Sequence, residues 1–300
     1  TGWTDTNQDG IAQAQELTFV DLNQDGRFSA EYWGMTDSSG KSPDIFGTGT
    51  VKTGAWSYGG VTTTDVSTGE AFTGILSVPD GASMVTPLTT LIAAALSSST
   101  GASEADIQAA QAKVLASLGI SADAGVDLLA FDPLSTLANT DASAPAGNAL
   151  QIAALEVQKA ALQVANLLKV VQEAASAAGV TDMAAVLNSV GSTLVSSAQS
   201  GEKINLSDPA LIGSAMASVA QAAAAELGED SNAVKVLVAQ QDSIKAAVAA
   251  VNDKLGSLID SAVKSAASGA GAINVSSLLT DVVATQIVAQ QNVAAQVSNS

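Results

Sequence analysis

Two runs near the start of the chain carry oxygen-bearing side chains at the spacing of a calcium-binding loop. In the first run these residues stand at loop positions 1, 3, 5 and 12, and Gly10 stands at position 6. A calcium ion takes about six to eight oxygen ligands, the glycine allows a sharp turn, and the backbone carbonyl at position 7 points inward. The ligands that we predict in this loop are Asp5, Asn7, Asp9, the carbonyl of Ile11, and Glu16.

The second run repeats this pattern less completely. Gly26 again occupies position 6, but Glu31 stands at position 11, one residue short of the expected position 12. Either the loop is shortened, or Asp37 or a water molecule completes it. The ligands that we predict are Asp21, Asn23, Asp25, the carbonyl of Arg27, and Glu31. The alternative for both runs is a simple turn between strands, because Asp-Gly is a strong hairpin signal.

Only short secondary-structure elements have room to flank these two loops. Paired EF-hand loops have a helix on each side, whereas only residues 17–20 separate these two. We therefore expect the loops at the edges of a small β module, which bound calcium stabilises by linking its segments. Runs of apolar and β-branched residues between turn clusters predict short strands at 17–20, 51–53, 61–64 and 71–78.

A change of composition near residue 80 predicts two domains. Nine of the ten aromatic residues precede residue 73, whereas the chain after residue 84 is rich in Ala, Leu, Val, Ser and Gln. We predict an α+β fold, with a calcium-binding β module at residues 1–80 and a mainly α-helical, Ala-rich bundle at residues 84–300.

Capping residues mark the ends of about seven predicted helices, of which the first two cover residues 87–96 and 104–118. The predicted N-caps are Ser103, which forms a capping box with Asp106, and Thr181, Asp208 and Ser231. The glycines that we predict to end helices are Gly119, Gly179, Gly201, Gly228 and Gly269.

Two of the helices are long and carry apolar residues at alternating spacings of three and four, which requires a partner helix. The first of these seams consists of Leu150, Ala154, Val157, Ala161, Val164, Leu168 and Val171. The second consists of Leu237, Ile244, Val248, Val251, Leu255 and Leu258.

The composition restricts the chemistry available to this chain. It has no Cys and no His, which excludes thiolate nucleophiles, Ser-His-Asp triads and the commonest zinc and haem ligands. Its net charge of -18 disfavours nucleic acid and anionic lipid, and no apolar stretch reaches the roughly 20 residues of a membrane span. We expect a soluble, non-catalytic piece of a longer protein, with no nucleic-acid partner and no membrane insertion.

Several segments resemble a known group of proteins. The Asp-x-Asn-x-Asp-Gly runs look like the calcium-binding B-type repeats of bacterial surface proteins, and residues 65–76 and 85–91 are similar to a segment of very long secreted proteins. These relatives are RTX-type and cadherin-like adhesins, and the similarity continues through residues 118–120 and 127–134. The resemblance implies export, calcium-rich surroundings and a role in surface attachment or assembly. It supplies metal ligands and no catalytic residue.

The resulting functional prediction is an extracellular, calcium-binding structural or adhesion module at the bacterial cell surface, of adhesin or surface-layer type. Its expected partners are other surface-protein modules or copies of itself. One alternative is a secreted carbohydrate-binding module with polysaccharide as partner, in which aromatic residues stack on sugars: Trp3, Tyr32, Trp33, Trp56 and Tyr58. A second alternative is a subunit that assembles into filaments or sheets when calcium binds.

Overall fold

The computed structural model describes residues 75–96, 102–121, 125–140, 145–197, 203–268, 277, 278 and 280–287, together with the backbone of five short strands before residue 63. Helices make up 77% of the described residues from 75 onward, and β6 (Leu76–Val78) is the single strand among them. The described part of the chain is therefore mainly α-helical.

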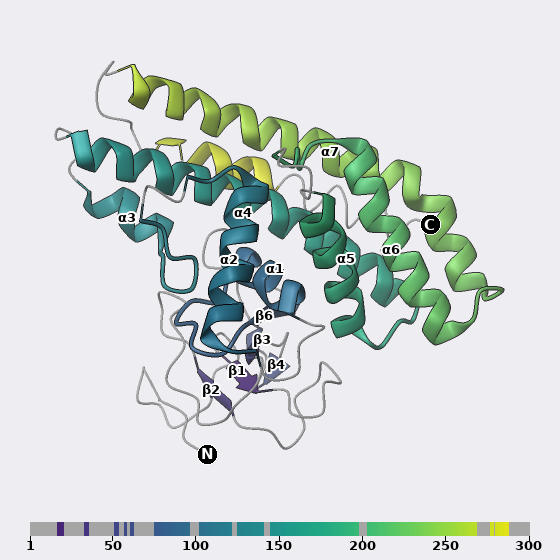
Figure 1. The fold of residues 1–300 in the computed structure, drawn as a ribbon. Coiled ribbons are helices and arrows are strands. Elements are labelled where there is room, and N and C mark those ends of the chain that lie inside the picture. Colours follow the sequence, from purple (N-terminus) through teal and green to yellow (C-terminus); the bar gives the residue numbers. More distant parts are fainter. Residues whose placement is uncertain are drawn as a thin grey trace.

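In the part of the chain that the structure describes, helices α1 to α7 follow β6, and the two longest run antiparallel to each other (Figure 1). The helix α7 packs on α4 and on α6, α6 packs on α5, and α5 packs on α1. Their bounds are α1 (Pro87–Leu96), α2 (Glu104–Leu118), α3 (Pro133–Asn139), α4 (Pro145–Ala177), α5 (Met183–Ser197), α6 (Pro209–Leu227) and α7 (Asn232–Ala267). Residues 280–287 add a further helical stretch.

The strands before residue 63 are two to four residues long: β1 (Leu17–Val20), β2 (Trp33–Met35), β3 (Val51–Thr53), β4 (Ser57–Tyr58) and β5 (Val61–Thr62). Their backbones pair antiparallel in the order β2-β1-β3-β6, and β4 pairs with β5. In this register Val51 lies opposite Val78.

The predicted α+β fold, with a β module followed by a bundle, is wrong, because the described residues from 75 onward are 77% helical and contain a single short strand. Helices also bond to that strand and to the residue before it. The backbone N–H of Ser77 donates to Thr90 Oγ1 of α1 (3.0 Å), and that of Ile75 donates to Gln172 Oε1 of α4 (2.6 Å). Val78 is only 1% exposed. A short apolar run predicts a strand equally well in either setting, so the sequence did not reveal these helical neighbours. The division at residues 80–84 stays a prediction.

The predicted helix ends are largely confirmed, because capping is a local interaction. Ser103 and Asp106 form the capping box of α2, and Gly119 ends this helix with φ 68°. The hydrogen bonds from Ser103 lower the pKa of Asp106. The residues Asp208 and Ser231 cap α6 and α7, and Gly228 follows α6. The predicted stops Gly201 and Gly269 lie outside the described residues.

The start of α5 differs from the prediction by one residue. The backbone N–H of Ala185 donates to Asp182 Oδ1 (2.9 Å), so Asp182 rather than Thr181 caps this helix. Glu226, on α6, accepts hydrogen bonds from the backbone N–H groups of Thr181 (2.9 Å) and Asp182 (3.1 Å). A carboxylate from a neighbouring helix therefore lies at the positive end of α5, which fastens the two helices together.

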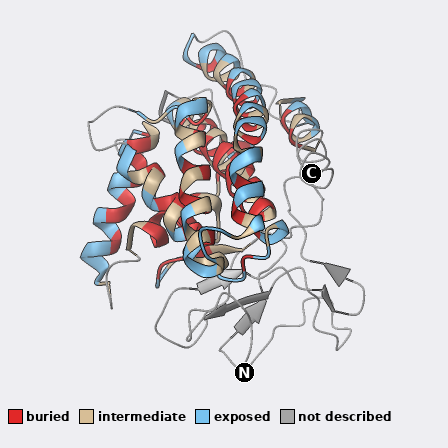
Figure 2. Ribbon diagram, turned by 90° about the vertical axis from the view of Figure 1, so that its right-hand side faces the viewer, coloured by how far each residue is buried: buried red, intermediate tan, exposed pale blue. Residues whose placement is uncertain are grey.

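The core of the described residues consists of two hydrophobic clusters, and α4 contributes to both. Figure 2 shows buried residues along the helices, with exposed residues on their outer faces. The first cluster joins β6, α1, α2, α5, α6 and the N-terminal half of α7 to α4. The second joins α3, α4, the C-terminal half of α7 and the stretch 280–287; its buried members are Leu137, Ala154, Leu155, Leu162, Leu255, Ile259 and Val282. Because α4 supplies both clusters, it is the central helix of the described bundle.

Helix α6 is the one described helix that is long and apolar enough to cross a membrane by length and composition. Its residues Ile212, Met216 and Val219 are buried in the first core cluster. Core helices of bundles meet the same criterion, so this helix is weak evidence for a membrane span. The prediction of no membrane insertion stays a prediction.

Candidate functional site

The predicted calcium ligands all lie outside the described residues. They are Asp5, Asn7, Asp9, Ile11, Glu16, Asp21, Asn23, Asp25, Arg27 and Glu31. The side chains of the predicted sugar-stacking aromatics, Trp3, Tyr32, Trp33, Trp56 and Tyr58, lie outside them as well. Within the part of the chain that the structure does describe, no three acidic side chains come together in a group that could hold a metal ion.

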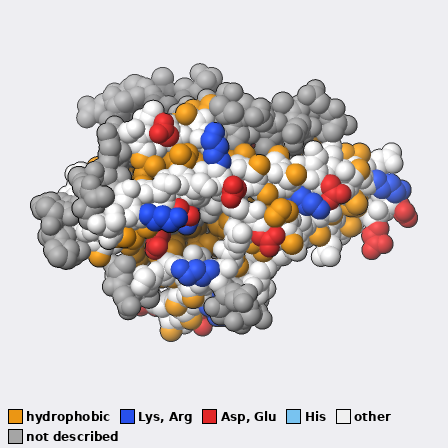
Figure 3. Space-filling model, turned by 90° about the horizontal axis from the view of Figure 1, so that it is seen from above, with side chains coloured by type: hydrophobic (Ala, Val, Ile, Leu, Met, Phe, Trp, Pro, Cys, Tyr) orange, Lys and Arg blue, Asp and Glu red, His pale blue; other side chains and the backbone are white. Residues whose placement is uncertain are grey.

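A polar groove opens on the described bundle. It lies between α4, α7, the end of α2 and residues 203–207, which lead from α5 to α6, and its volume is about 240 Å³. Its charged lining consists of Glu156, Lys159, Lys203, Asp253 and Asp260. Acidic and basic side chains are intermixed on the face seen in Figure 3, with no large patch of one sign.

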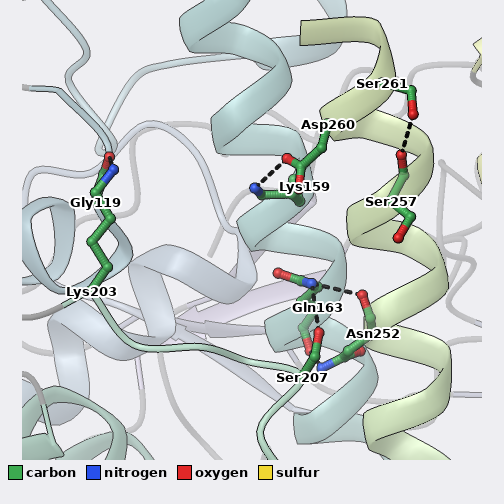
Figure 4. A network of polar contacts seen from close by, with 9 residues as sticks. All are labelled: Gly119, Lys159, Gln163, Lys203, Ser207, Asn252, Ser257, Asp260 and Ser261. Atoms are coloured by element: carbon green, nitrogen blue, oxygen red, sulfur yellow. Dashed lines mark hydrogen bonds and ion pairs between the residues drawn. The ribbon is translucent and has the colours of Figure 1, made fainter. Parts of the chain in front are cut away.

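Both lysines of the groove hold parts of the fold together (Figure 4). The Lys159 Nζ atom of α4 lies 2.7 Å from Asp260 Oδ1 of α7. The Lys203 Nζ atom donates to the carbonyl oxygen of Gly119, just past the end of α2 (3.0 Å). An ammonium at this position complements the partial negative charge of the helix C-terminus. The cationic side chains of the groove therefore connect separate helices.

Three buried amide side chains, Gln163, Asn166 and Asn252, bond to one another next to this groove, and we call them the amide cluster; Gln163 also lines the groove. The side chain of Asn252 is fully buried and that of Asn166 is 1% exposed. Asn166 Nδ2 donates to Asn252 Oδ1 (2.9 Å), and Gln163 Nε2 donates to the backbone carbonyl of Asn252 (2.8 Å). In return, Asn252 Nδ2 donates to the carbonyl of Gln163 (3.2 Å). The cluster thus joins α4 to α7 in both directions.

The amide cluster also fastens the segment 203–207. Asn252 Nδ2 donates to the carbonyl of Leu206 (2.7 Å), and the backbone N–H of Ile204 donates to the carbonyl of Ser117 at the end of α2 (2.8 Å). A Cβ atom at Gly256 of α7 would lie 3.1 Å from Gln163 Nε2. The absence of a side chain at Gly256 therefore lets the Gln163 amide pack closely over α7.

The groove offers hydrogen-bonding and charged groups, and the prediction that the chain is not an enzyme stays a prediction. The chain has no thiol and no imidazole. Among the described carboxylates, the one whose pKa is raised is Glu173 of α4, which does not line the groove. Burial raises the pKa of Glu173, and Lys169 Nζ, 3.9 Å away, acts in the opposite direction. Its Oε2 atom is buried and finds no hydrogen-bond partner in the structure described.

The charge of Glu173 is predicted to lower the stability of the protein at neutral pH. A raised folded-state pKa contributes stability below the unfolded value of 4.5, and this contribution is lost as the pH rises through the folded value. The substitution Glu173→Gln should therefore raise Tm by about 2 to 4 °C at about pH 7, and the advantage should vanish near pH 4. Thermal unfolding followed by circular dichroism at both pH values measures this difference.

The control for this experiment is Glu156→Gln, which removes the same charge from the half-exposed groove side of the same helix. It should leave Tm within about 1 °C of the wild type at both pH values. A Tm below that of the wild type for Glu173→Gln at neutral pH would contradict the prediction, because it would mean that the charged carboxylate is stabilising.

The amide cluster was not predicted from the sequence, although one of its residues carries a signal. Asn252 stands four residues after Val248 and three before Leu255, so it occupies a seam position of α7. A polar residue at a position that the spacing assigns to the apolar seam indicates either a break in the seam or a buried polar contact.

Comparisons of the chain with protein-family models, with curated proteins and with solved structures found no match.

Proposed function

We propose that this chain is a calcium-binding structural module of an exported bacterial surface protein, of adhesin or surface-layer type. The observation that carries the proposal is the first loop, in which four oxygen-bearing side chains and one glycine stand at the required positions between Asp5 and Glu16. The resemblance of this segment to calcium-binding repeats of bacterial adhesins supports it. The module would hold its shape and contact neighbouring modules or further copies.

The contacts of the described bundle support a structural role. The charged groups of the groove connect helices, as in the ion pair between Lys159 and Asp260. The buried amides connect α4, α7 and the segment 203–207. Lys159, Asp260 and the buried amides therefore hold separate segments of the bundle together.

The charge of the chain explains how calcium would act. The net charge is -18, and the two loops place six carboxylates between residues 5 and 31. Clustered carboxylates repel one another until a divalent ion bridges them. Calcium binding would therefore order the segment that carries the loops, in a chain that has no disulfide bonds.

Calorimetric titration of calcium into the EDTA-treated protein tests the proposal. We expect heat from two sites, and we expect Glu16→Ala to weaken the first site by about tenfold or more, because this glutamate closes the shell with two oxygens. The matched control is Glu70→Ala, an acidic residue outside both loops, which should leave both affinities unchanged. No heat from the wild-type protein would overturn the proposal and would mean that the runs are turns.

Light scattering of the calcium-free and calcium-loaded protein separates the module from an assembling subunit. An unchanged molar mass supports a module that calcium stabilises within a longer chain. A mass that grows on loading would favour calcium-driven assembly into filaments or sheets.

A further inference from the structure

The amide cluster lies where the two longest helices cross from one hydrophobic cluster to the other. Helix α4 has 33 residues and α7 has 36. Along α7, Asn252 stands between Ala249 of the first core cluster and Leu255 of the second. On α7 the cluster is therefore a polar position between two apolar layers, one from each hydrophobic cluster.

The register of the helix pair is the choice of which residue of α4 lies opposite which residue of α7. Neither the apolar layers nor the ion pair between Lys159 and Asp260 distinguishes the observed register from a shifted one. Ala, Val and Leu fill the seams of both helices, so a shift places similar side chains against each other. Asp253 stands seven residues before Asp260, on the same face of α7. A shift of two helical turns would bring Asp253 opposite Lys159, so the ion pair could form again.

The amide cluster, in contrast, forms its hydrogen bonds in one register only. The same shift would move Asn252 about 10 Å along the helix pair from Asn166, so the hydrogen bond between the two asparagines would be lost. It would also withdraw Asn252 from the carbonyl of Leu206. Buried amides without partners are costly, so the shifted pairing is disfavoured.

The cluster is not arranged for greatest stability. Asn166 Oδ1 is buried and has no hydrogen-bond partner in the part of the chain that is described. Replacing a buried polar group of this kind with packed apolar residues is often neutral or stabilising, and a single buried Asn is known to select register and partner in paired helices. An incompletely satisfied cluster at the crossing of two Ala-rich helices fits that role.

We propose that the amide cluster fixes the register of α4 on α7 and keeps these two helices paired within one chain. Without it, their seams would accept shifted pairings or the corresponding helices of a second copy. In an array of neighbouring modules this selectivity prevents exchange of helices between copies. The inference does not depend on calcium.

Crosslinking tests the proposal, because the chain has no native Cys and every engineered pair can be read without background. The pair Lys159→Cys and Asp260→Cys reports the observed register. The pair Lys159→Cys and Asp253→Cys reports the shifted one, since Asp253 lies about 10 Å further along α7. Each pair is introduced with the amide cluster intact and with Asn166→Leu and Asn252→Leu, and is treated with a short thiol crosslinker such as dibromobimane.

With the cluster intact we expect crosslinking within one chain at 159 and 260 and at least tenfold less at 159 and 253. With both asparagines replaced by leucine we expect retained helicity and either crosslinking at 159 and 253 or crosslinked dimers. The matched control is Asn188→Leu at an exposed position of α5, which should leave the yields of both crosslinks unchanged.

Two results would overturn the proposal. In the first, the doubly substituted chain stays monomeric and crosslinks at 159 and 260 alone, so the register is fixed by something else. In the second, the doubly substituted chain loses its helical circular dichroism, so the amides are needed for stability and their role is not selectivity.

Discussion

Replacing Asn252 with alanine is expected to lower the free energy of unfolding by about 3 kcal/mol. The side chain is fully buried and bonds to three partners on two other segments. Truncation removes these bonds and leaves Asn166 Nδ2 and the carbonyl of Leu206 buried without partners. A lost hydrogen bond costs little by itself, whereas each buried group left unpaired costs about 1 to 3 kcal/mol.

Urea unfolding followed by circular dichroism at 222 nm measures this loss. The matched control is Asn188→Ala, the same substitution at an exposed position within α5, which should change the free energy of unfolding by no more than about 0.5 kcal/mol. Similar values for the two variants would contradict the prediction, because they would show that the bonds of Asn252 do not contribute in the folded state.

Interactions between near neighbours in the chain were predictable from the sequence. The capping box of α2 joins Ser103 to Asp106, and the stop at Gly119 depends on the backbone conformation of that residue. The bounds of α1 and α2 follow from such signals and agree with residues 87–96 and 104–118. Local hydrogen bonds require no knowledge of the rest of the fold, so sequence spacing is enough to predict them.

Interactions between distant segments were not predictable in the same way. Gln172 of α4 holds Ile75, the residue before β6, across 97 residues. The bond between Asn166 and Asn252 spans 86 residues. The apolar spacing showed that both long helices need partners, but in an Ala-rich chain many pairings satisfy that requirement equally well. Which amides meet is decided by the three-dimensional packing.

Replacing Gly191 with alanine is expected to lower the free energy of unfolding by about 2 kcal/mol, although the opposite follows from helix propensity. Glycine within a helix costs about 1 kcal/mol relative to alanine, so an alanine at this position of α5 would ordinarily stabilise the protein. Gly191, however, is buried where α5 meets α1, and a Cβ atom there would overlap the Cβ atom of Ala94. A short side chain on a helix backbone cannot move aside, so the two helices must separate, and overpacking of this kind costs about 1 to 3 kcal/mol.

Gly213 of α6 provides the matched comparison for Gly191. It also lies within a helix, but the nearest atom to a Cβ there would be Lys245 Cδ at 3.6 Å, which is an ordinary contact with a flexible side chain. Gly213→Ala should therefore raise the free energy of unfolding by about 0.5 to 1 kcal/mol, as propensity predicts. Opposite signs for the two variants in urea unfolding would show that contact with α1 outweighs helix propensity at Gly191. A stabilising effect of Gly191→Ala would instead mean that α1 and α5 do not approach this closely in solution.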